Sequence, residues 1–188
     1  MTTLAAIQTK NFVIIGADSQ SSGEDGFSID IPDGKIFNNN GVIIAGAGAV
    51  RGINLLQHNF VAPKVGRSNT DRYIAKTLIP AMRKLFDEHG YEVKRSDSSA
   101  ENDNIWIVAI NGECYRIDED YSFERATNNT YTAGSGERFA MGALEALIDS
   151  FDLCIVKDVE ILIKRAIEIS AKYDAFTGGE IKTVIQYR

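Results

Sequence analysis

Thr2 is the residue whose type and position in the sequence could do chemistry. An initiator methionine is removed when the next residue is as small as threonine, and Thr2 would then carry a free α-amine beside its hydroxyl. An α-amine has a reference pKa of about 7.7–8.0, so part of it is neutral near pH 7, where a general base must be poised. A threonine that uses its own amine as base is an activated nucleophile. A chain that begins Met-Thr-Thr is common, however, so residues downstream must decide.

Asp174, near the end of the chain, is a second residue whose position suggests a chemical role. The last predicted helix starts near Asp158, and steps of three and four residues place Asp174 at the end of its apolar stripe. A carboxylate that faces the core is costly unless it is paired. We therefore expect Asp174 to have polar partners inside the fold.

Two other chemistries are weaker alternatives. Residues 46–52 form a glycine-rich turn between a strand and a helix, but the spacing is GxGxxxG and the strand belongs to a hairpin, which disfavours a dinucleotide site. Asp30 and Asp33 lack the spacing of a calcium loop, and His58 and His89 are too isolated for a zinc site. The sequence predicts no cofactor and no metal.

Short apolar runs bounded by turn residues predict the strands that must position these groups. The first two, residues 4–9 and 12–17, are joined by a turn at Lys10-Asn11. An Asn-Gly turn closes a hairpin between residues 35–37 and 42–45. Further strands are expected at residues 27–31, 104–110, 113–118, 121–126 and 180–188.

Four helices are expected between these strands. The first ends near Val61, and the second covers residues 71–88, capped by Thr70, kinked at Pro80 and ended by Gly90. The third covers residues 137–151 and has small or apolar residues on most of its surface, so it should pack between two layers or against another subunit. Strands, two helices, strands, two helices and a strand predict an α+β fold: a four-layer αββα sandwich of two antiparallel sheets between helix layers.

Composition narrows the class of protein. A length of 188 residues predicts a single domain, 1–188, because one core can fill that size. The net charge of −6 argues against nucleic acid or an anionic membrane as a partner. No apolar run reaches the ~18 residues of a membrane span. Two isolated cysteines, Cys114 and Cys154, suit a reducing cytoplasm.

Taken together, the motifs resemble those of the proteasome β-type subunits and the bacterial proteasome-like peptidase, within the N-terminal-nucleophile hydrolases. The resemblance covers essentially the whole chain. Its matching elements, in order, are Thr2-Thr3, Ala17-Asp18-Ser19, Lys35, Ala45-Gly46, Gly134-Ser135-Gly136 and the run from Asp174 to Gly179.

The resemblance implies a role for each matched residue. Thr2 would be the nucleophile, Lys35 would favour the neutral Thr2 amine by its charge, and Asp18 would hold Lys35. The Gly46 N–H would stabilise the oxyanion. In addition, a polar cluster would surround the terminal amine, formed by Ser135, Asp174 and Thr177. The loop between Asp18 and Lys35 is one residue longer than is usual in the family.

The activity implied is that of a threonine-type endopeptidase acting on polypeptides inside a self-compartmentalising homo-oligomeric ring, which an ATP-dependent unfoldase could feed. Two other interpretations stay open from the sequence. One is a catalytically silent proteasome-fold structural or assembly subunit, in particular if Met1 is retained. The other is an amidase of the same superfamily that acts on a small amide.

Overall fold

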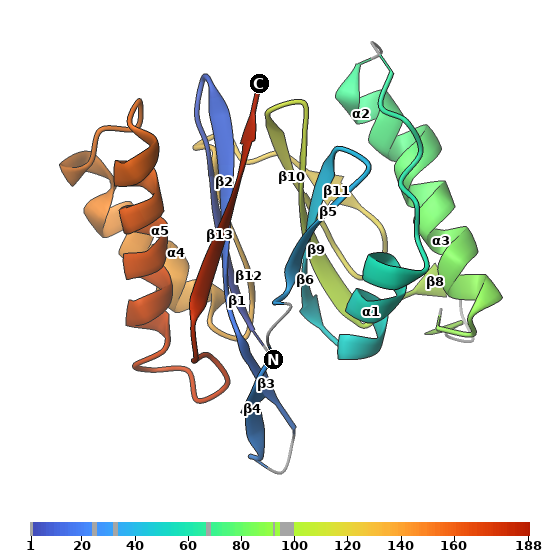
Figure 1. Ribbon diagram of the computed structural model, residues 1–188, viewed down its shortest axis with the longest axis horizontal. Coiled ribbons are helices and arrows are strands. Elements are labelled where there is room, and N and C mark those ends of the chain that lie inside the picture. Colours follow the sequence, from blue (N-terminus) through green and yellow to red (C-terminus); the bar gives the residue numbers. More distant parts are fainter. Residues whose placement is uncertain (1, 24–25, 32–33, 67–68, 92, 95–99) are drawn as a thin grey trace.

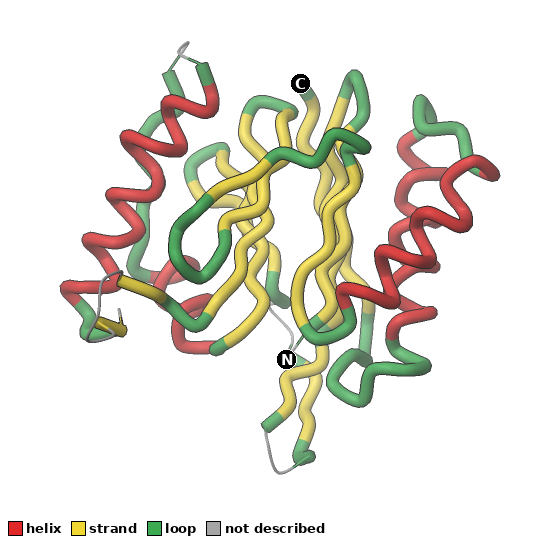
Figure 2. Tube along the Cα trace, turned by 180° about the vertical axis from the view of Figure 1, so that it is seen from behind, coloured by secondary structure: helices red, strands yellow, loops and turns green. Residues whose placement is uncertain are grey.

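The structure is a computed structural model that describes residues 2–23, 26–31, 34–66, 69–91, 93–94 and 100–188. Two antiparallel sheets lie face to face, and helices cover the outer side of each (Figure 1; Figure 2 shows the same layers from behind). The expected four-layer αββα sandwich is therefore confirmed. No helix among the described residues is long and apolar enough to cross a membrane.

The first sheet contains the start of the chain. Its strands, in spatial order, are β12 (Thr130–Gly134), β1 (Thr3–Gln8), β2 (Phe12–Asp18) and β13 (Ile181–Tyr187). Thr3 pairs with Gly134 at one end of β1. Two helices pack on the outer face of this sheet, α4 (Glu137–Leu147) and α5 (Val156–Ser170), with a 3₁₀ turn at Ile148–Ser150 between them. The start of β1 is thus held between β12 and the end of β2.

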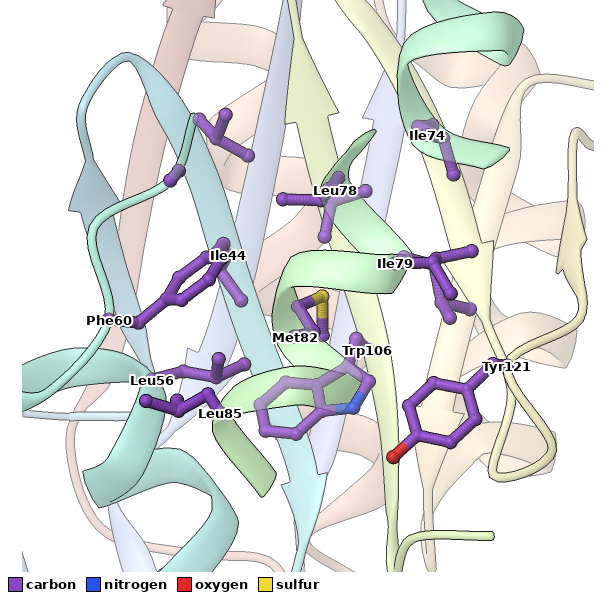
Figure 3. Close-up of a cluster of buried hydrophobic side chains, with 14 of the residues drawn as sticks. Ile44, Leu56, Phe60, Ile74, Leu78, Ile79, Met82, Leu85, Trp106 and Tyr121 are labelled. Atoms are coloured by element: carbon purple, nitrogen blue, oxygen red, sulfur yellow. The ribbon is translucent and has the colours of Figure 1, made fainter. Parts of the chain in front are cut away.

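The second sheet provides the opposite wall. Its strands, in spatial order, are β11 (Phe123–Glu124), β10 (Glu113–Ile117), β9 (Asn104–Ile110), β6 (Val42–Gly48) and β5 (Ile36–Asn39). Its outer face is covered by α1 (Val50–His58), α2 (Thr70–Tyr73) and α3 (Ile79–Glu88). Figure 3 shows the side chains in this layer, where Trp106 lies fully buried next to Leu85 and Met82.

Two short hairpins complete the strands. β3 (Gln20–Ser22) and β4 (Ser28–Asp30) pair and project beyond the end of the sheets (Figure 1). β7 (Val93–Lys94) pairs with β8 (Ala100–Glu101).

The alternation of side chains along β1 decides which layer each residue enters. Leu4 and Ala6 belong to the apolar cluster between the two sheets. Ala5 and Ile7 belong to the cluster beneath α4 and α5. By the same alternation, Thr3 faces the helices and Thr2 faces the space between the sheets.

Two expectations about strands were wrong. The strand expected at residues 121–126 is reduced to Phe123–Glu124, because Tyr121 adopts a left-handed conformation (φ 65°) and closes a turn onto the Asp118 carbonyl. No strand was expected at residues 130–134, but they form β12 on the edge of the first sheet. Their sequence, TYTAG, is rich in the β-branched and aromatic residues that fit a pleated sheet.

The helix expected at residues 71–88 is divided at Pro80. A π-helical turn at Ile74–Leu78 separates α2 from α3, and the Ile79 N–H donates to the Ile74 carbonyl five residues earlier. Pro80 has no N–H to continue the regular ladder, so the wider turn accommodates it. The cap also differs from the expectation, since the side chain of Asn69, not Thr70, accepts the Arg72 N–H.

Candidate active site

Thr2 lies at the junction of the two sheets, where β1 begins. It is only 2% exposed and lines a hollow of ≈ 230 Å³ together with Ala47, Gly48, Gly134 and Ser135. Gly134 has φ +96°, and a Cβ at this position would collide with the Thr2 carbonyl. A glycine is therefore needed for the backbone to pass this close to Thr2.

Lys35 and Asp18 form a buried ion pair next to the start of β1. The Lys35 Nζ lies 2.8 Å from Asp18 Oδ1 and 2.7 Å from the Gln20 carbonyl oxygen. Asp18 also accepts the N–H groups of Thr3 (2.9 Å) and Gly178 (3.1 Å). The structure thus brings Lys35 into the site despite the longer loop before it, with Asp18 as its counter-ion.

Burial and charge act in opposite directions on Lys35. Loss of hydration lowers the pKa of its ammonium group, while Asp18 and, more weakly, Asp174 raise it, and the net shift is downward from the usual value. The nearby carboxylates therefore offset only part of the cost of burying the Lys35 ammonium. Such a group can stabilise negative charge that develops close to it.

Asp174 has the polar partners that its core-facing position requires. Its Oδ2 accepts hydrogen bonds from Ser135 Oγ (2.7 Å) and Thr177 Oγ1 (2.6 Å), and its Oδ1 accepts the Phe176 N–H (3.4 Å). Ser135 Oγ also lies 3.4 Å from the Thr2 carbonyl oxygen. The three predicted members of this cluster are therefore in contact with one another, and Ser135 connects them to Thr2.

Thr177 contacts a different threonine from the expected one. Its Oγ1 lies 2.6 Å from Thr3 Oγ1, which also lies 2.9 Å from Ser170 Oγ. Ser170 donates to the Gly136 carbonyl at 3.0 Å. Thr3 and Ser170 were not assigned a role from the sequence, although Ser170 lies four residues before Asp174 on the same helical stripe.

The Gly46 N–H is not available in the way the sequence predicted. It donates to the Lys35 carbonyl at 3.0 Å, as part of the pairing between β5 and β6. Successive N–H groups of a strand point to opposite sides, so the next N–H on this side belongs to Gly48, where the described part of β5 has ended. Because Gly48, not Gly46, lines the hollow with Thr2, the assignment of the oxyanion donor needs correction.

The backbone around Gly48 is held by a buried asparagine. Asn104 Nδ2 donates to the carbonyls of Ala47 (3.3 Å) and Ala49 (3.0 Å), on either side of Gly48. The Tyr91 hydroxyl donates to Asn104 Oδ1, which leaves the two Nδ2 hydrogens for those carbonyls. Gly48 has φ +128°, and a Cβ there would collide with the Asp103 carbonyl. A side-chain clamp and a glycine thus set the orientation of this turn.

A metal does not fit the described part of the molecule. Within the described residues, no group of three or more histidine, cysteine, aspartate or glutamate side chains is arranged to hold a metal ion. The groups gathered around the first residues of β1 are an ammonium, two carboxylates, hydroxyls and backbone N–H groups. These are the components of acid–base and nucleophilic chemistry.

No protein-family model and no curated protein sequence matches this chain. Solved structures do match it over nearly its whole length. BPH of Thiobacillus denitrificans in complex with epoxomicin superposes with a TM-score of 0.81 at 15% identity, covering 98% of both chains. BPH without that ligand gives 0.81 at 16% identity, over 98% of this chain and 97% of the other. Eukaryotic HslV from Trypanosoma brucei gives 0.68 at 21% identity, over 99% of both chains. At these identities the likeness establishes the fold.

Proposed function

We propose that this chain, which has the fold of the proteasome-like N-terminal-nucleophile hydrolases, is a threonine-type endopeptidase with Thr2 as its nucleophile once Met1 is removed. One observation carries the proposal: an ammonium–carboxylate pair and a hydroxyl–carboxylate cluster converge on the first residues of β1. An inert core position at this place would be apolar, because buried charges are costly.

The first step uses the two functional groups of Thr2 itself. The neutral α-amine accepts the hydroxyl proton while Oγ1 attacks the carbonyl carbon of the substrate peptide bond, and the carbonyl π electrons move onto oxygen. The positive charge of Lys35 favours the neutral form of the amine and the negative charge that forms on Oγ1. Asp18 keeps Lys35 in place through its 2.8 Å contact.

The tetrahedral intermediate carries its charge on the former carbonyl oxygen. The Gly48 N–H, on the edge of the hollow, is the donor we assign to this oxyanion. Collapse of the intermediate breaks the C–N bond, and the ammonium of Thr2 gives its proton to the leaving amine. An ester between Thr2 and the acyl part of the substrate remains.

Water completes the cycle. The Thr2 amine takes a proton from the water as the water oxygen attacks the ester carbon. Collapse of this second tetrahedral intermediate breaks the bond to Oγ1, the amine returns the proton to Oγ1, and the carboxylic acid is released. Ser135 lies between Asp174 and the Thr2 backbone, so we assign it to holding the amine and relaying its proton.

Assembly is part of the same proposal. Self-compartmentalising peptidases are closed rings, and we extend this to a homo-oligomeric ring of this chain in the cytoplasm, with an ATP-dependent unfoldase as a further partner. On α4 the residues at Phe139, Gly142 and Ala146 are exposed and leave an apolar, small-residue face open to such contacts. Light scattering of the purified chain should show a multi-subunit assembly, and a monomer at micromolar concentration would contradict the ring.

Epoxomicin tests the nucleophile directly, since BPH of the same fold binds this compound. An epoxyketone that reacts with both the hydroxyl and the amine of Thr2 should add one molecule to each processed chain in an intact mass spectrum. Thr2→Ala provides the control and should stay unmodified. A processed chain that neither reacts nor cleaves peptides would reject the peptidase, and a chain that keeps Met1 would favour the silent subunit.

A further inference from the structure

The hollow beside Thr2 is lined by acidic residues. Three of its lining residues carry a carboxylate: Asp103, Glu119 and Glu137. They come from different parts of the chain, namely the segment before β9, the turn after β10 and the first turn of α4. The fold therefore gathers negative charge in the hollow that Thr2 lines.

A second hollow continues this acidic surface outward. It has a volume of ≈ 480 Å³ and shares Ile105 and Glu119 with the hollow at Thr2. Its other acidic lining residues are Glu101, Asp118 and Asp120. Among the described residues, no lysine or arginine lines either hollow. Glu119 lies where the two hollows meet.

These carboxylates differ in how far the fold neutralises them. Arg116 lies 2.9 Å from both Asp118 and Glu137, so these two are compensated. In the described part of the chain, Asp103 and Glu119 form no ion pair, and both are exposed. The charge that remains available to a substrate is therefore centred on Glu119 and Asp103.

Independent of the charge, Thr2 marks this hollow as a binding site. Its side chain is buried, lines the hollow and forms no hydrogen bond to another described residue. A bound substrate would supply the missing contact, which is not required of a structural hydroxyl.

We propose that Glu119, assisted by Asp103, makes this chain select substrates that carry a lysine or arginine side chain beside the scissile bond. This rests on the proposed peptidase function and names its substrate class. A guanidinium or ammonium group is the natural partner of an exposed carboxylate that has no cation of its own.

The test uses peptides that differ only in charge. Two internally quenched peptides carry either arginine or its neutral isostere citrulline at the residue next to the scissile bond, tried on each side of that bond. The processed protein should cleave the arginine peptide with a kcat/KM up to roughly fivefold above that of the citrulline peptide, since fivefold is the upper limit for one exposed ion pair. The preference should fall in 1 M salt, where the Debye length is about 3 Å.

Variants assign the preference to its residues. Glu119→Gln should bring the ratio of the two kcat/KM values close to one, and Asp103→Asn should reduce the ratio less. Glu88→Gln removes one exposed charge at the end of α3, which lines neither hollow, and should leave the ratio unchanged. Asp120 lines only the outer hollow. Asp120→Asn should therefore change the ratio least of the three carboxylate substitutions near the site.

Two outcomes would overturn the inference and leave the peptidase intact: equal cleavage of both peptides by the unaltered protein, or a preference that survives Glu119→Gln combined with Asp103→Asn. If neither peptide is cleaved, the peptidase proposal fails. The preference for a basic side chain can then still be tested by measuring peptide binding. In that case fluorescence anisotropy of the two labelled peptides with the Thr2→Ala variant should show tighter binding of the arginine peptide. Equal binding there would reject the acidic hollow as a site for basic side chains.

Discussion

Two neighbouring threonines have opposite environments in this molecule. Thr3 faces the helix layer, where its Oγ1 contacts the hydroxyls of Ser170 and Thr177 at 2.9 and 2.6 Å. Thr2 faces the space between the sheets and its side chain has no hydrogen-bond partner among the described residues. Both are buried. The same residue type is thus a structural link at one position and a candidate nucleophile at the next.

The difference follows from the pleat of one strand. Successive side chains of β1 enter different layers, and the two layers have different chemistry. The helix layer closes around Thr3 with hydroxyls that are all bonded. The space between the sheets narrows toward Thr2 but leaves a hollow there, so this hydroxyl is left for a ligand.

The largest expected effect separates the two threonines directly. Thr2→Ala should abolish peptide hydrolysis and change the free energy of unfolding by less than about 1 kcal/mol, because no hydrogen bond is lost. Thr3→Val should lower the free energy of unfolding by about 1–3 kcal/mol, since two buried hydroxyls lose a partner, and should retain most of the activity. Hydrolysis rates and urea denaturation measure the two quantities. Loss of activity in a folded Thr3→Val protein would mean that the two regions are not separate.

Lys35 tests the electrostatic side of the Thr2 region. Lys35→Ala should reduce kcat by roughly 10²–10³, the usual loss on removal of a preorganised charge-stabilising group. Lys35→Arg should also fail, because a guanidinium is wider than an ammonium and cannot occupy its place, and Asp18→Asn should give a milder defect. Circular dichroism and light scattering must show that the variants fold and assemble. Near-normal turnover by a folded Lys35→Ala protein would remove Lys35 from the mechanism.

Asn104 can be compared with a second buried asparagine. Asn39 donates to the carbonyls of Leu56 and Phe60 at 3.0 and 2.9 Å, far from Thr2, as Asn104 does to those of Ala47 and Ala49. Replacing either by aspartate removes both donors and should destabilise the fold by about 1–3 kcal/mol.

Only the change at Asn104 should also lower kcat, by about tenfold with KM little changed, because it disturbs the turn that carries the Gly48 N–H. Steady-state kinetics of Asn104→Asp and Asn39→Asp at a temperature where both are folded decide the matter. An equal decrease of kcat in both variants would show that Asn104 stabilises the fold and has no separate role in positioning the Gly48 N–H.

The smallest expected effect is a shift in the pH profile. Burial lowers the pKa of Lys35 below its usual value of 10.5. The ammonium should therefore lose its proton at a lower pH than a free lysine, and kcat should fall with rising pH before pH 10.5 is reached. Stability should respond in the opposite sense: between the two pKa values the unfolded chain binds more protons, so this group alone adds stability as pH rises. An alkaline limb that lies at or above pH 10.5 would contradict the assignment of Lys35.

Much of this site could be predicted from the sequence. Asp174 ends an apolar helical stripe, so it had to be a buried carboxylate with partners, and the resemblance paired Asp18 with Lys35. The order of strands and helices was sufficient for the four layers. Local patterns failed where long-range contacts decide the result: β12 forms because β1 offers it a free edge, and the strand after Tyr121 is shortened by a turn.

By itself the sequence determined the period of β1, the charges at positions 18, 35 and 174, and the glycines that allow the backbone to pass close to Thr2, because these depend on residue type and spacing. Only the tertiary structure decided which donors are already used. The pairing of β5 with β6 occupies the Gly46 N–H, so the donor next to Thr2 becomes that of Gly48. Long-range packing likewise places the Thr177 hydroxyl in hydrogen-bond contact with the Thr3 hydroxyl. Hydrogen-bond partners are allocated between segments distant in the chain, and each donor or acceptor satisfied in one place is lost to another.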